Sequence, residues 1–434
     1  MRVALIGPLP PALGGSTPGG VASHQAHLAA GLAQRSDVLE GVVLLGTNVR
    51  ALAPATAWCP PMSDRPYPLL RSYVPTGPLG FARPGYLGRV GPGRLLRYMR
   101  AVRAWPQPGS RREVLGQLLW YAHFLDRVRP DVIHVQHPLE RHLFVRAVTR
   151  LEGVSAPVVV TAHSFFGEHP AATIDGLMAP NLRIADAVIA VSPHIAEQAT
   201  QLGAEPARVW TIRSGVDTAR FQPRERTAAR QALSIAADAR MVLFVGNLEP
   251  RKQVDVLLQA LPSTATLAII GSGESAGADD QTTYLQGLVD RLDLGERVRF
   301  VGRVPDEALL QWYAAADVFA LPSSSEAQGI AALEAMACGL PVVASAVGGL
   351  LGTIDDGHTG YLVPPGDVAA LGDRLQRLLD DRACAARLGH AARAAVLARF
   401  SWPQAVAATV EVYRAVCATR PRSAAGAGHV RGTA

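Results

Sequence analysis

Lysine is nearly absent from this chain of 434 residues. Lysine and arginine together number 42, and only Lys252 is a lysine, which leaves 42 − 1 = 41 arginines. Such a bias is typical of a genome that avoids lysine codons. The chain also lacks any apolar run near the roughly 18 residues of a membrane-spanning helix. Its start, MRVALIGPLPP, is too short and too soon interrupted by proline for a secretory signal. We therefore expect a cytoplasmic protein.

Cysteine is scarce as well. The four cysteines, at positions 59, 338, 384 and 417, show no metal-ligand spacing, so we expect free thiols and no disulfides. Charged residues make up 18% of the chain and apolar residues 49%. This balance excludes a disordered or fibrous protein and suffices for two hydrophobic cores of about 200 residues each.

Short apolar strands alternate with helical stretches in both halves, which predicts an α/β fold with two doubly wound parallel sheets. The strands predicted in the first half are 2–6, 41–45, 132–135, 157–161, 187–191 and 209–212. Those in the second half are 241–245, 266–270, 298–301, 318–321, 342–344 and 360–363. We predict domains at 1–222 and 223–400, with a basic insertion at about 60–129, a helix at 401–418 that returns to the first domain, and a disordered tail at 419–434.

The most informative segment is DVFALPSSSEAQGIAALEAMACGLPVVAS, residues 317–345. It predicts a buried strand, a loop, a helix from Gly329 to Cys338, and a second strand after Pro341. Glycine at the end of the helix and the proline that follows it both favour termination there.

Two carboxylates flank the start of this helix. In one continuous helix Glu326 and Glu334 would diverge by about 80°, whereas a loop residue and a residue of the first helical turn can converge on one ligand. The free N–H groups of Gln328, Gly329 and Ile330 would face anionic oxygens, and carboxylates accept hydrogen bonds from sugar hydroxyls. The arrangement suits a polyol beside a phosphate.

The segment resembles the signature of the family 4 glycosyltransferases, retaining enzymes of the GT-B fold, which reads P-S-x-x-E-G-F-G-x-x-x-L-E-A-M-A-x-G-x-P-V-V. The chain departs from it at Ala327 and Gln328. The resemblance implies two Rossmann-like domains that face each other across a cleft, with the nucleotide sugar bound by the second. The matching positions are Pro322, Ser323, Glu326, Gly329, Leu333, Glu334, Ala335, Met336, Ala337, Gly339 and Pro341.

Lys252 follows an apolar strand in MVLFVGNLEPRK, at the sheet edge where open α/β sheets bind ligands. Its compact charge suits a diphosphate that becomes more negative as a bond breaks. In the family the matching loop reads V-G-R-L-x-x-x-K-G, and its arginine and lysine both hold the diphosphate. Here Asn247 takes the arginine position and Gln253 the glycine position. We expect that Arg251 substitutes for the missing arginine, or that donor affinity or activity is lower.

Three further loops resemble family loops near the nucleotide sugar, although each alone is also an ordinary turn. The glycines at 19 and 20 precede a predicted helix and allow close approach of a ligand to the backbone. GSGE at 271–274 resembles the I-G-x-G loop, and the backbone of VGRVP at 301–305 contacts the nucleobase in relatives. The predicted donor-binding residues are Gly20, Asn247, Arg251, Lys252, Gly271, Gly273, Arg303, Val304, Glu326, Gln328, Gly329, Ile330 and Glu334.

One histidine is a candidate for catalysis. His163 ends the strand PVVVTAH, and in relatives the T-x-H histidine contacts the donor sugar or the acceptor side. The family commonly places Asp next, but Ser164 follows here, so no neighbour in sequence orients the imidazole. His134 and His137 are weaker candidates, and His24, on a helix face, is typical of a structural histidine. With Glu326 and Lys252, His163 completes the predicted catalytic set.

Residues 65–129 contain twelve arginines and two acids. The net positive charge of this stretch exceeds the net charge of +6 of the whole chain. Within them, RLLRYMRAVRAW predicts a basic amphipathic helix that carries Arg94, Arg97, Arg100 and Arg103. Such a helix can lie on an anionic membrane leaflet, cover an acceptor cleft or face solvent. No aromatic platform or base-reading motif accompanies the charge, so we expect no nucleic-acid partner.

Together these motifs predict a glycosyltransferase that moves a sugar from a nucleoside diphosphate to an acceptor hydroxyl. The resemblance implies retention by front-face attack, in which the leaving phosphate takes the acceptor proton, without a covalent intermediate, metal or cofactor. Two alternatives stay open. One is a nucleotide-sugar 2-epimerase on the same fold, and the other is a nucleotide-sugar-binding scaffold impaired by the changes at 247, 327 and 328.

Overall fold

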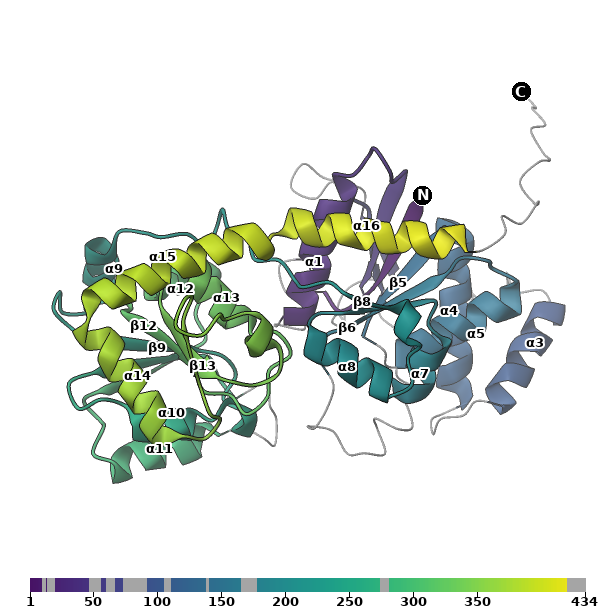
Figure 1. The fold of residues 1–434 in the computed structure, drawn as a ribbon. Coiled ribbons are helices and arrows are strands. Elements are labelled where there is room, and N and C mark those ends of the chain that lie inside the picture. The colour runs from purple at the N-terminus through teal and green to yellow at the C-terminus, as the bar shows by residue number, and fades with distance from the viewer. Residues whose placement is uncertain are drawn as a thin grey trace. The chain divides into compact units, whose positions relative to one another are not determined.

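The computed structural model describes residues 1–9, 13, 20–46, 56–59, 67–72, 92–104, 111–137, 140–164, 178–273 and 281–419. They form two compact units (Figure 1). The first unit comprises residues 1–190, 196–212 and those from 406 on, and the second comprises 191–195 and 213–405. Apart from 191–195, the second unit thus begins at Arg213, nine residues before position 222 (222 − 213 = 9), where we predict the first domain to end. The predicted tail lies outside the described residues except for Thr419.

The first unit is built on an eight-stranded sheet in the order β3-β4-β2-β1-β5-β6-β7-β8. All neighbouring strands run parallel except β3 and β4, which pair antiparallel. The order reverses between β1 and β5, which makes their carboxyl ends the topological switch point. The strands are β1 (Arg2–Gly7), β2 (Gly41–Gly46), β3 (Thr56–Cys59), β4 (Leu69–Ser72), β5 (Val132–Gln136), β6 (Val158–Ala162), β7 (Ala187–Ala190) and β8 (Val209–Thr211).

The central strands are mostly apolar and buried on both faces, as expected for a parallel sheet covered by helices. Every residue of β5 and β6 is buried, because these strands read VIHVQ and VVVTA. The helices are α1 (Gly20–Ala33), α3 (Pro92–Arg103), α4 (Arg111–Val128), α5 (Glu140–Glu152), α7 (Ala179–Ile184), α8 (Pro193–Gln201), which starts in the second unit, and most of α16 (Trp402–Ala418). Helix α3 packs on α4 and α5 and forms the outer layer there (Figure 1).

The second unit contains a six-stranded sheet in the order β11-β10-β9-β12-β13-β14, parallel throughout. This is the doubly wound order of a Rossmann fold, and its switch point lies between β9 and β12. The two doubly wound sheets are confirmed. The strands are β9 (Met241–Val245), β10 (Thr266–Ile270), β11 (Val298–Gly302), β12 (Val318–Leu321), β13 (Val342–Ser345) and β14 (Tyr361–Val363).

Helices cover both faces of this sheet (Figure 1). One group contains α10 (Val254–Ala260), α11 (Thr282–Arg291) and α14 (Val368–Asp380). The other group contains α9 (Arg226–Ala232), α12 (Asp306–Ala315), α13 (Ile330–Ala337) and α15 (Arg382–Arg399). The short 3₁₀ turns η4 (Pro250–Lys252) and η6 (Gly348–Gly352) follow β9 and β13 and shape the carboxyl edge of the sheet.

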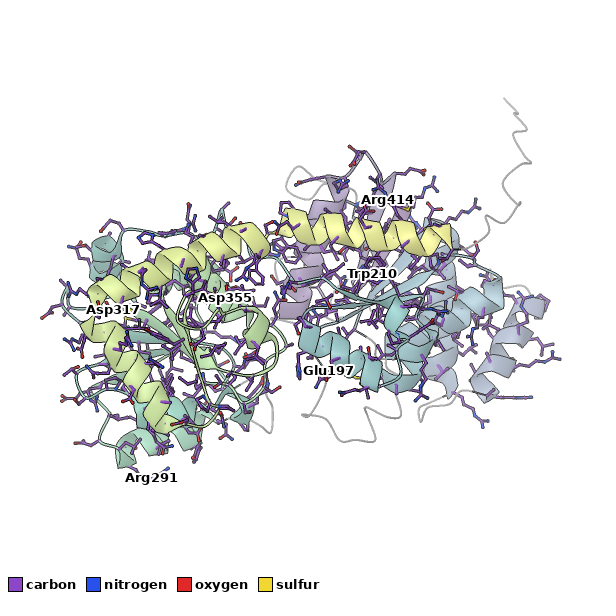
Figure 2. All side chains as sticks on the ribbon, viewed as in Figure 1. Glu197, Trp210, Arg291, Asp317, Asp355 and Arg414 are labelled. Atoms are coloured by element: carbon purple, nitrogen blue, oxygen red, sulfur yellow. The ribbon has the colours of Figure 1, made fainter. Side chains whose placement is uncertain are left out.

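Asp317, labelled in Figure 2, fixes the opposite edge of the sheet. Its carboxylate accepts hydrogen bonds from the guanidinium groups of Arg226 and Arg230 and from the backbone N–H of Met241. The side chain of Arg230 is only 3% exposed and also donates to the carbonyl of Ala315. A buried charge needs such full pairing, so this cluster ties α9 to the start of β9 and β12.

In the parts of the chain that the structure describes, no helix combines the length and the apolar composition needed to cross a membrane.

Candidate active site

Lys252 and Glu326 meet at the switch point of the second sheet. Lys252 ends η4, just after β9, and Glu326 lies in the loop that follows β12. The Lys252 Nζ forms an ion pair with Glu326 Oε1, and the two side chains are only 12% and 9% exposed. The hydroxyl of Ser323 donates a second hydrogen bond to the same carboxylate oxygen, 3.0 Å away. A buried cation and a buried anion therefore share the edge where this fold binds ligands.

The ion pair sets the charge of Glu326. Burial alone would raise the pKa of this carboxyl, but the adjacent ammonium of Lys252 outweighs burial, with help from Arg251 and Ser323. The pKa of Glu326 is therefore lowered, and the group is an anion at neutral pH. An anionic carboxylate acts only as a hydrogen-bond acceptor, which suits sugar hydroxyls.

Glu249 organises the loop that lacks the family's arginine. Its carboxylate accepts a hydrogen bond from the amide of Asn247 at 3.1 Å and one from Arg251 Nε at 2.7 Å. The backbone carbonyl of Arg251 accepts from the backbone N–H of Ser324 at 2.8 Å, which joins this loop to the loop of Glu326. The guanidinium of Arg251 thus pairs with Glu249 in the turn that also carries Lys252, and its substitution for the family's arginine stays a prediction. Sequence reasoning missed Glu249.

The amino end of α13 presents free backbone donors. The helix begins at Ile330, after Gly329 in the left-handed region with φ 79°. The N–H groups of Gln328, Gly329 and Ile330 donate to no acceptor among the residues that the structure describes. They point to where the helix dipole favours an anion.

Gln328, a departure from the family signature, contacts the backbone of Ser214. The side-chain amide of Gln328 accepts from the backbone N–H of Ser214 at 3.0 Å and donates to the backbone carbonyl of Ser214 at 2.9 Å. Gln328 is buried, so these two bonds satisfy an otherwise costly amide. The glutamine that replaces an aromatic residue in the signature therefore connects this loop to Ser214.

The glycine pair Gly348-Gly349 supports the loop of Glu326, and the sequence analysis missed this pair as well. The N–H of Gly349 donates to the backbone carbonyl of Glu326 at 2.8 Å. A Cβ on Gly348, which has φ 48°, would lie 2.1 Å from the same carbonyl oxygen. Only glycine permits this approach. The signal in the sequence is the Gly-Gly dipeptide at 348–349, separated by two residues from the end of β13.

Glu334 lies apart from this ion pair. Because α13 begins at Ile330, Glu334 falls in its second turn, and the expectation of a first-turn residue was wrong. Its carboxylate accepts a hydrogen bond from the hydroxyl of Tyr313 at 2.9 Å. Burial raises the pKa of Glu334 to about 7, although this hydrogen bond and Arg220 oppose the shift. Glu334 therefore titrates near neutral pH, and within the described residues no hydrogen bond joins it to Glu326.

Backbone hydrogen bonds connect the loops after β9, β10 and β11. Gly246 donates to the carbonyl of Ile270 at 2.9 Å, and Gly271 donates to the carbonyl of Gly302 at 3.0 Å. A Cβ on Gly271 would lie 1.9 Å from the carbonyl oxygen of Gly246, so the close approach requires glycine there. Gly273 is buried in the same loop, while Arg303, directly after β11, is exposed and Val304 half-buried. Residue 274 lies outside the described residues.

The first unit has its own polar cluster at the ends of β5 and β6. His163 Nε2 lies 2.7 Å from Gln136 Oε1, and the His163 ring meets the ring of His24 edge to face at 4.6 Å. His24 belongs to α1, whose first residue, Gly20, is exposed. Residue 19 lies outside the described part of the chain. His163 thus contacts Gln136, to which the sequence analysis assigned no role, and His24, which it interpreted as a structural histidine.

His134 is held at both ring nitrogens inside the first unit. Its Nδ1 lies 2.7 Å from the hydroxyl of Tyr413 on α16, and its Nε2 lies 2.6 Å from Thr161 Oγ1. Burial, reinforced by His24, lowers the pKa of His134 to about 3. Burial and the neighbouring His27 lower the pKa of His24 to about 3 as well. These imidazoles are neutral at physiological pH, and the pairing of His134 indicates a structural role.

Known proteins match nearly the whole chain. The family model described as "Glycosyl transferases group 1" matches residues 225–395, and the one described as "Glycosyltransferase Family 4" matches residues 18–220. A D-inositol 3-phosphate glycosyltransferase 2 from Catenulispora acidiphila is 33% identical over 401 residues, which cover 85% of this chain and 86% of that protein. The chain belongs to glycosyltransferase family 4.

Other similarities agree. A D-inositol 3-phosphate glycosyltransferase from Streptomyces scabiei is 35% identical over 360 residues, covering 75% of this chain and 78% of that protein. Sucrose-phosphate synthase from Thermosynechococcus elongatus matches with a TM-score of 0.76 and 25% identity, over 96% of this chain and all of that one. The GT-B fold and the assignment as a glycosyltransferase, both expected from the sequence, are confirmed.

Proposed function

We propose that this glycosyltransferase moves a sugar from a nucleoside diphosphate to an acceptor hydroxyl with retention of anomeric configuration. The contact between Lys252 and Glu326 at the switch point carries the proposal. The ammonium offers a cation to the diphosphate, and the carboxylate offers an acceptor to the sugar hydroxyls. A ligand that contains both groups is a nucleotide sugar. The relatives are named for D-inositol 3-phosphate, so a polyol or sugar hydroxyl is the acceptor class that we propose.

In the proposed reaction the bond between the anomeric carbon and the phosphate oxygen breaks, and its electron pair stays on the diphosphate. The acceptor oxygen attacks from the same face, and its proton passes to a phosphate oxygen. Lys252 and the amino end of α13 stabilise the leaving charge, and Glu326 orients the sugar. Glu334 binds the ribose hydroxyls, and His163 contacts the reacting sugars. The other donor contacts that we propose are Gly20, Asn247, Arg251, Gly271, Gly273, Arg303 and Val304.

A donor screen tests this function. Thermal shift against UDP, GDP and ADP sugars selects the donor, and transfer to polyol and sugar acceptors is then measured. NMR of the product should show the anomeric configuration of the donor. An inverted product would refute retention. Tight nucleotide binding with neither transfer nor hydrolysis across all donors would favour the impaired scaffold, and C2-epimerised sugar from UDP-N-acetylglucosamine alone would favour the epimerase.

We also propose that α3 docks this enzyme on an anionic membrane surface. Tyr98 and Val102 face the protein, whereas Leu96 is 51% exposed and Met99 42% exposed. Three residues apart, Leu96 and Met99 are neighbours on the outer face. The helix contains four arginines and no acid. Its outward arginines, Arg97, Arg100 and Arg103, are all exposed.

Arg94 has a different role from the other three arginines. Its guanidinium donates to Glu152 at 2.9 Å and to Asp126 at 2.8 Å. These bonds hold α3 against α5 and α4, so Arg94 is the inner anchor of the helix. The surface that we propose for the membrane therefore consists of Leu96, Arg97, Met99, Arg100 and Arg103.

Vesicle co-sedimentation tests the docking surface. The protein should bind vesicles that contain phosphatidylglycerol and not vesicles of phosphatidylcholine alone. Replacing Arg97, Arg100 and Arg103 by Gln should weaken binding about 100-fold, because each arginine near an anionic leaflet contributes about 1 kcal/mol. The matched control replaces the exposed Arg2, Arg208 and Arg382 by Gln. An equal loss in the control would reduce the effect to net charge and refute a dedicated surface.

A further inference from the structure

The first unit contains an unassigned glutamine at its switch point. Gln136 is the last residue of β5, next to the carboxyl end of β1 in the sheet. It is fully buried. Open α/β sheets bind ligands at such a point, so a buried polar side chain there acts close to a ligand.

The hydrogen bond between Gln136 and His163 determines where the imidazole carries its proton. An amide oxygen is only an acceptor, so at 2.7 Å from Gln136 Oε1 the ring nitrogen Nε2 must donate. The ring is neutral, because burial, followed by the neighbouring His24, lowers the pKa of His163 well below its ordinary value. In a neutral imidazole with the proton on Nε2, Nδ1 is an acceptor.

His163 has an unused acceptor at a half-buried position. It makes no other hydrogen bond within the described residues. The ring of His24 packs edge to face on it at an interplanar angle of 81°, which fixes the ring plane. The ring therefore presents Nδ1 in one orientation, as a site for a hydroxyl donor.

The floor of this site is polar and incompletely paired. Gln136 Nε2 and both amide atoms of Gln25 on α1 are buried and have no hydrogen-bond partner among the residues that the structure describes. A Cβ on Gly7, the last residue of β1, would lie 1.9 Å from Gln25 Oε1 and 2.8 Å from Gln136 Cβ. Gly7 thus makes room for both glutamines. Unpaired buried amides cost stability, so they point to a ligand or water that pairs with them.

We propose that Gln136 is a positioning residue for transfer. It holds His163 as the neutral Nε2–H tautomer, so that Nδ1 accepts a hydrogen bond from a hydroxyl of the bound sugar or acceptor. The role of Gln136 in transfer rests on the proposed function, whereas the tautomer does not. Gln136 thereby orients a histidine that Ser164 follows in this chain, where the family commonly has aspartate.

The tautomer can be measured without any substrate. In protein labelled with ¹⁵N-histidine, long-range couplings distinguish Nε2–H from Nδ1–H rings, and His163→Gln assigns the signal. His163 should be an Nε2–H ring at neutral pH. Gln136→Met should give a mixture of tautomers, and Gln136→Glu should raise the pKa of His163. Tyr413→Phe, which removes a hydrogen bond from His134 instead, should leave the His163 signal unchanged.

Kinetics then test the positioning role. Gln136→Met should lower the transfer rate about tenfold, the value of one hydrogen bond, with the donor KM within about twofold. In Gln136→Glu the new ionisation of His163 should appear in the pH profile of the rate. An Nδ1–H or protonated His163 in the wild type overturns the proposal, and so does a wild-type rate in Gln136→Met. If the wild type transfers no sugar at all, the proposed function fails, and the tautomer still decides whether Gln136 positions the ring.

Discussion

The two sheets have the same strand arrangement at their switch points but carry different polar groups there. In the second unit the edge between β9 and β12 holds a buried ion pair, Lys252 with Glu326. In the first unit the edge of β5 and β6 holds neutral groups, the amide of Gln136 and the imidazole of His163. The fold determines where a ligand binds, and the side chains determine its charge. A charged edge suits a diphosphate, and a neutral edge suits hydroxyl groups.

Removing the ion pair should have the largest effect on function. Lys252→Ala and Glu326→Ala should each lower turnover about 100-fold or more, as removal of a transition-state donor does. Each variant leaves a buried charge without its partner, so folding must be verified by thermal unfolding. The matched control is Arg240→Ala, which breaks the exposed ion pair between Arg240 and Asp380, whose nitrogen and oxygen lie 2.7 Å apart. This variant should retain full turnover. Wild-type rates in both site variants would refute the site assignment.

The sequence predicts the charged edge well, because each residue there follows a clear strand. The predicted strands 241–245, 266–270 and 318–321 coincide with β9, β10 and β12, since each is a continuous apolar run with polar or turn-forming flanks. Lys252 and Glu326 lie in the connecting segments that follow two of them. Parallel strands place their carboxyl ends at one edge, so proximity of the two residues could be inferred from order alone.

The neutral edge could not be predicted in this way. The contact between Gln136 and His163 depends on the register of β5 and β6, which places Gln136 opposite Thr161, two residues before His163. Local patterns do not specify that register. Strands β3 and β4 were missed for a different reason. Both are only four residues long, and β4 lies in the arginine-rich stretch, where Arg71 interrupts its apolar pattern.

Lowering the pH should destabilise the first unit more than the second. The pKa of His134 is lowered in the fold, so the unfolded chain binds the proton more readily, and stability falls as pH drops below about 6.5. At pH 5 this single histidine removes about 2 kcal/mol from the first unit, from 1.5 pH units at 1.36 kcal/mol each. Hydrogen exchange, corrected for intrinsic rates, should therefore rise in peptides of β5, β6 and α16 between pH 7 and pH 5.

The second unit supplies the internal comparison for this experiment. Its Glu334 has a raised pKa, so its contribution to stability changes with the opposite sign, increasing as pH falls from about 7 toward 4.5. Peptides of α12 and α13 should show no matching loss of protection. A His134→Gln variant should lose only the share of this pH dependence that His134 contributes, because the lowered pKa values of His24 and His163 act in the same direction in the first unit. Equal deprotection of both units in the wild type would contradict the contrast between neutral and charged edges.

Glu334 should give the smallest effect, a pH dependence of nucleotide binding. If the carboxylate accepts hydrogen bonds from ribose hydroxyls, only its ionised form binds well, and that form is lost below pH 7. Affinity for the nucleotide chosen by thermal shift should therefore fall by up to about tenfold per pH unit below 7, with proton release on binding. The terminal phosphate of the nucleotide titrates in the same range, so the variant Glu334→Gln supplies the baseline. Calorimetry at pH 6 and pH 8, in buffers of different ionisation enthalpy, separates the two titrations. If wild type and Glu334→Gln show the same pH dependence, Glu334 does not contact the ribose, and the second carboxylate of the signature serves α12 through Tyr313 instead.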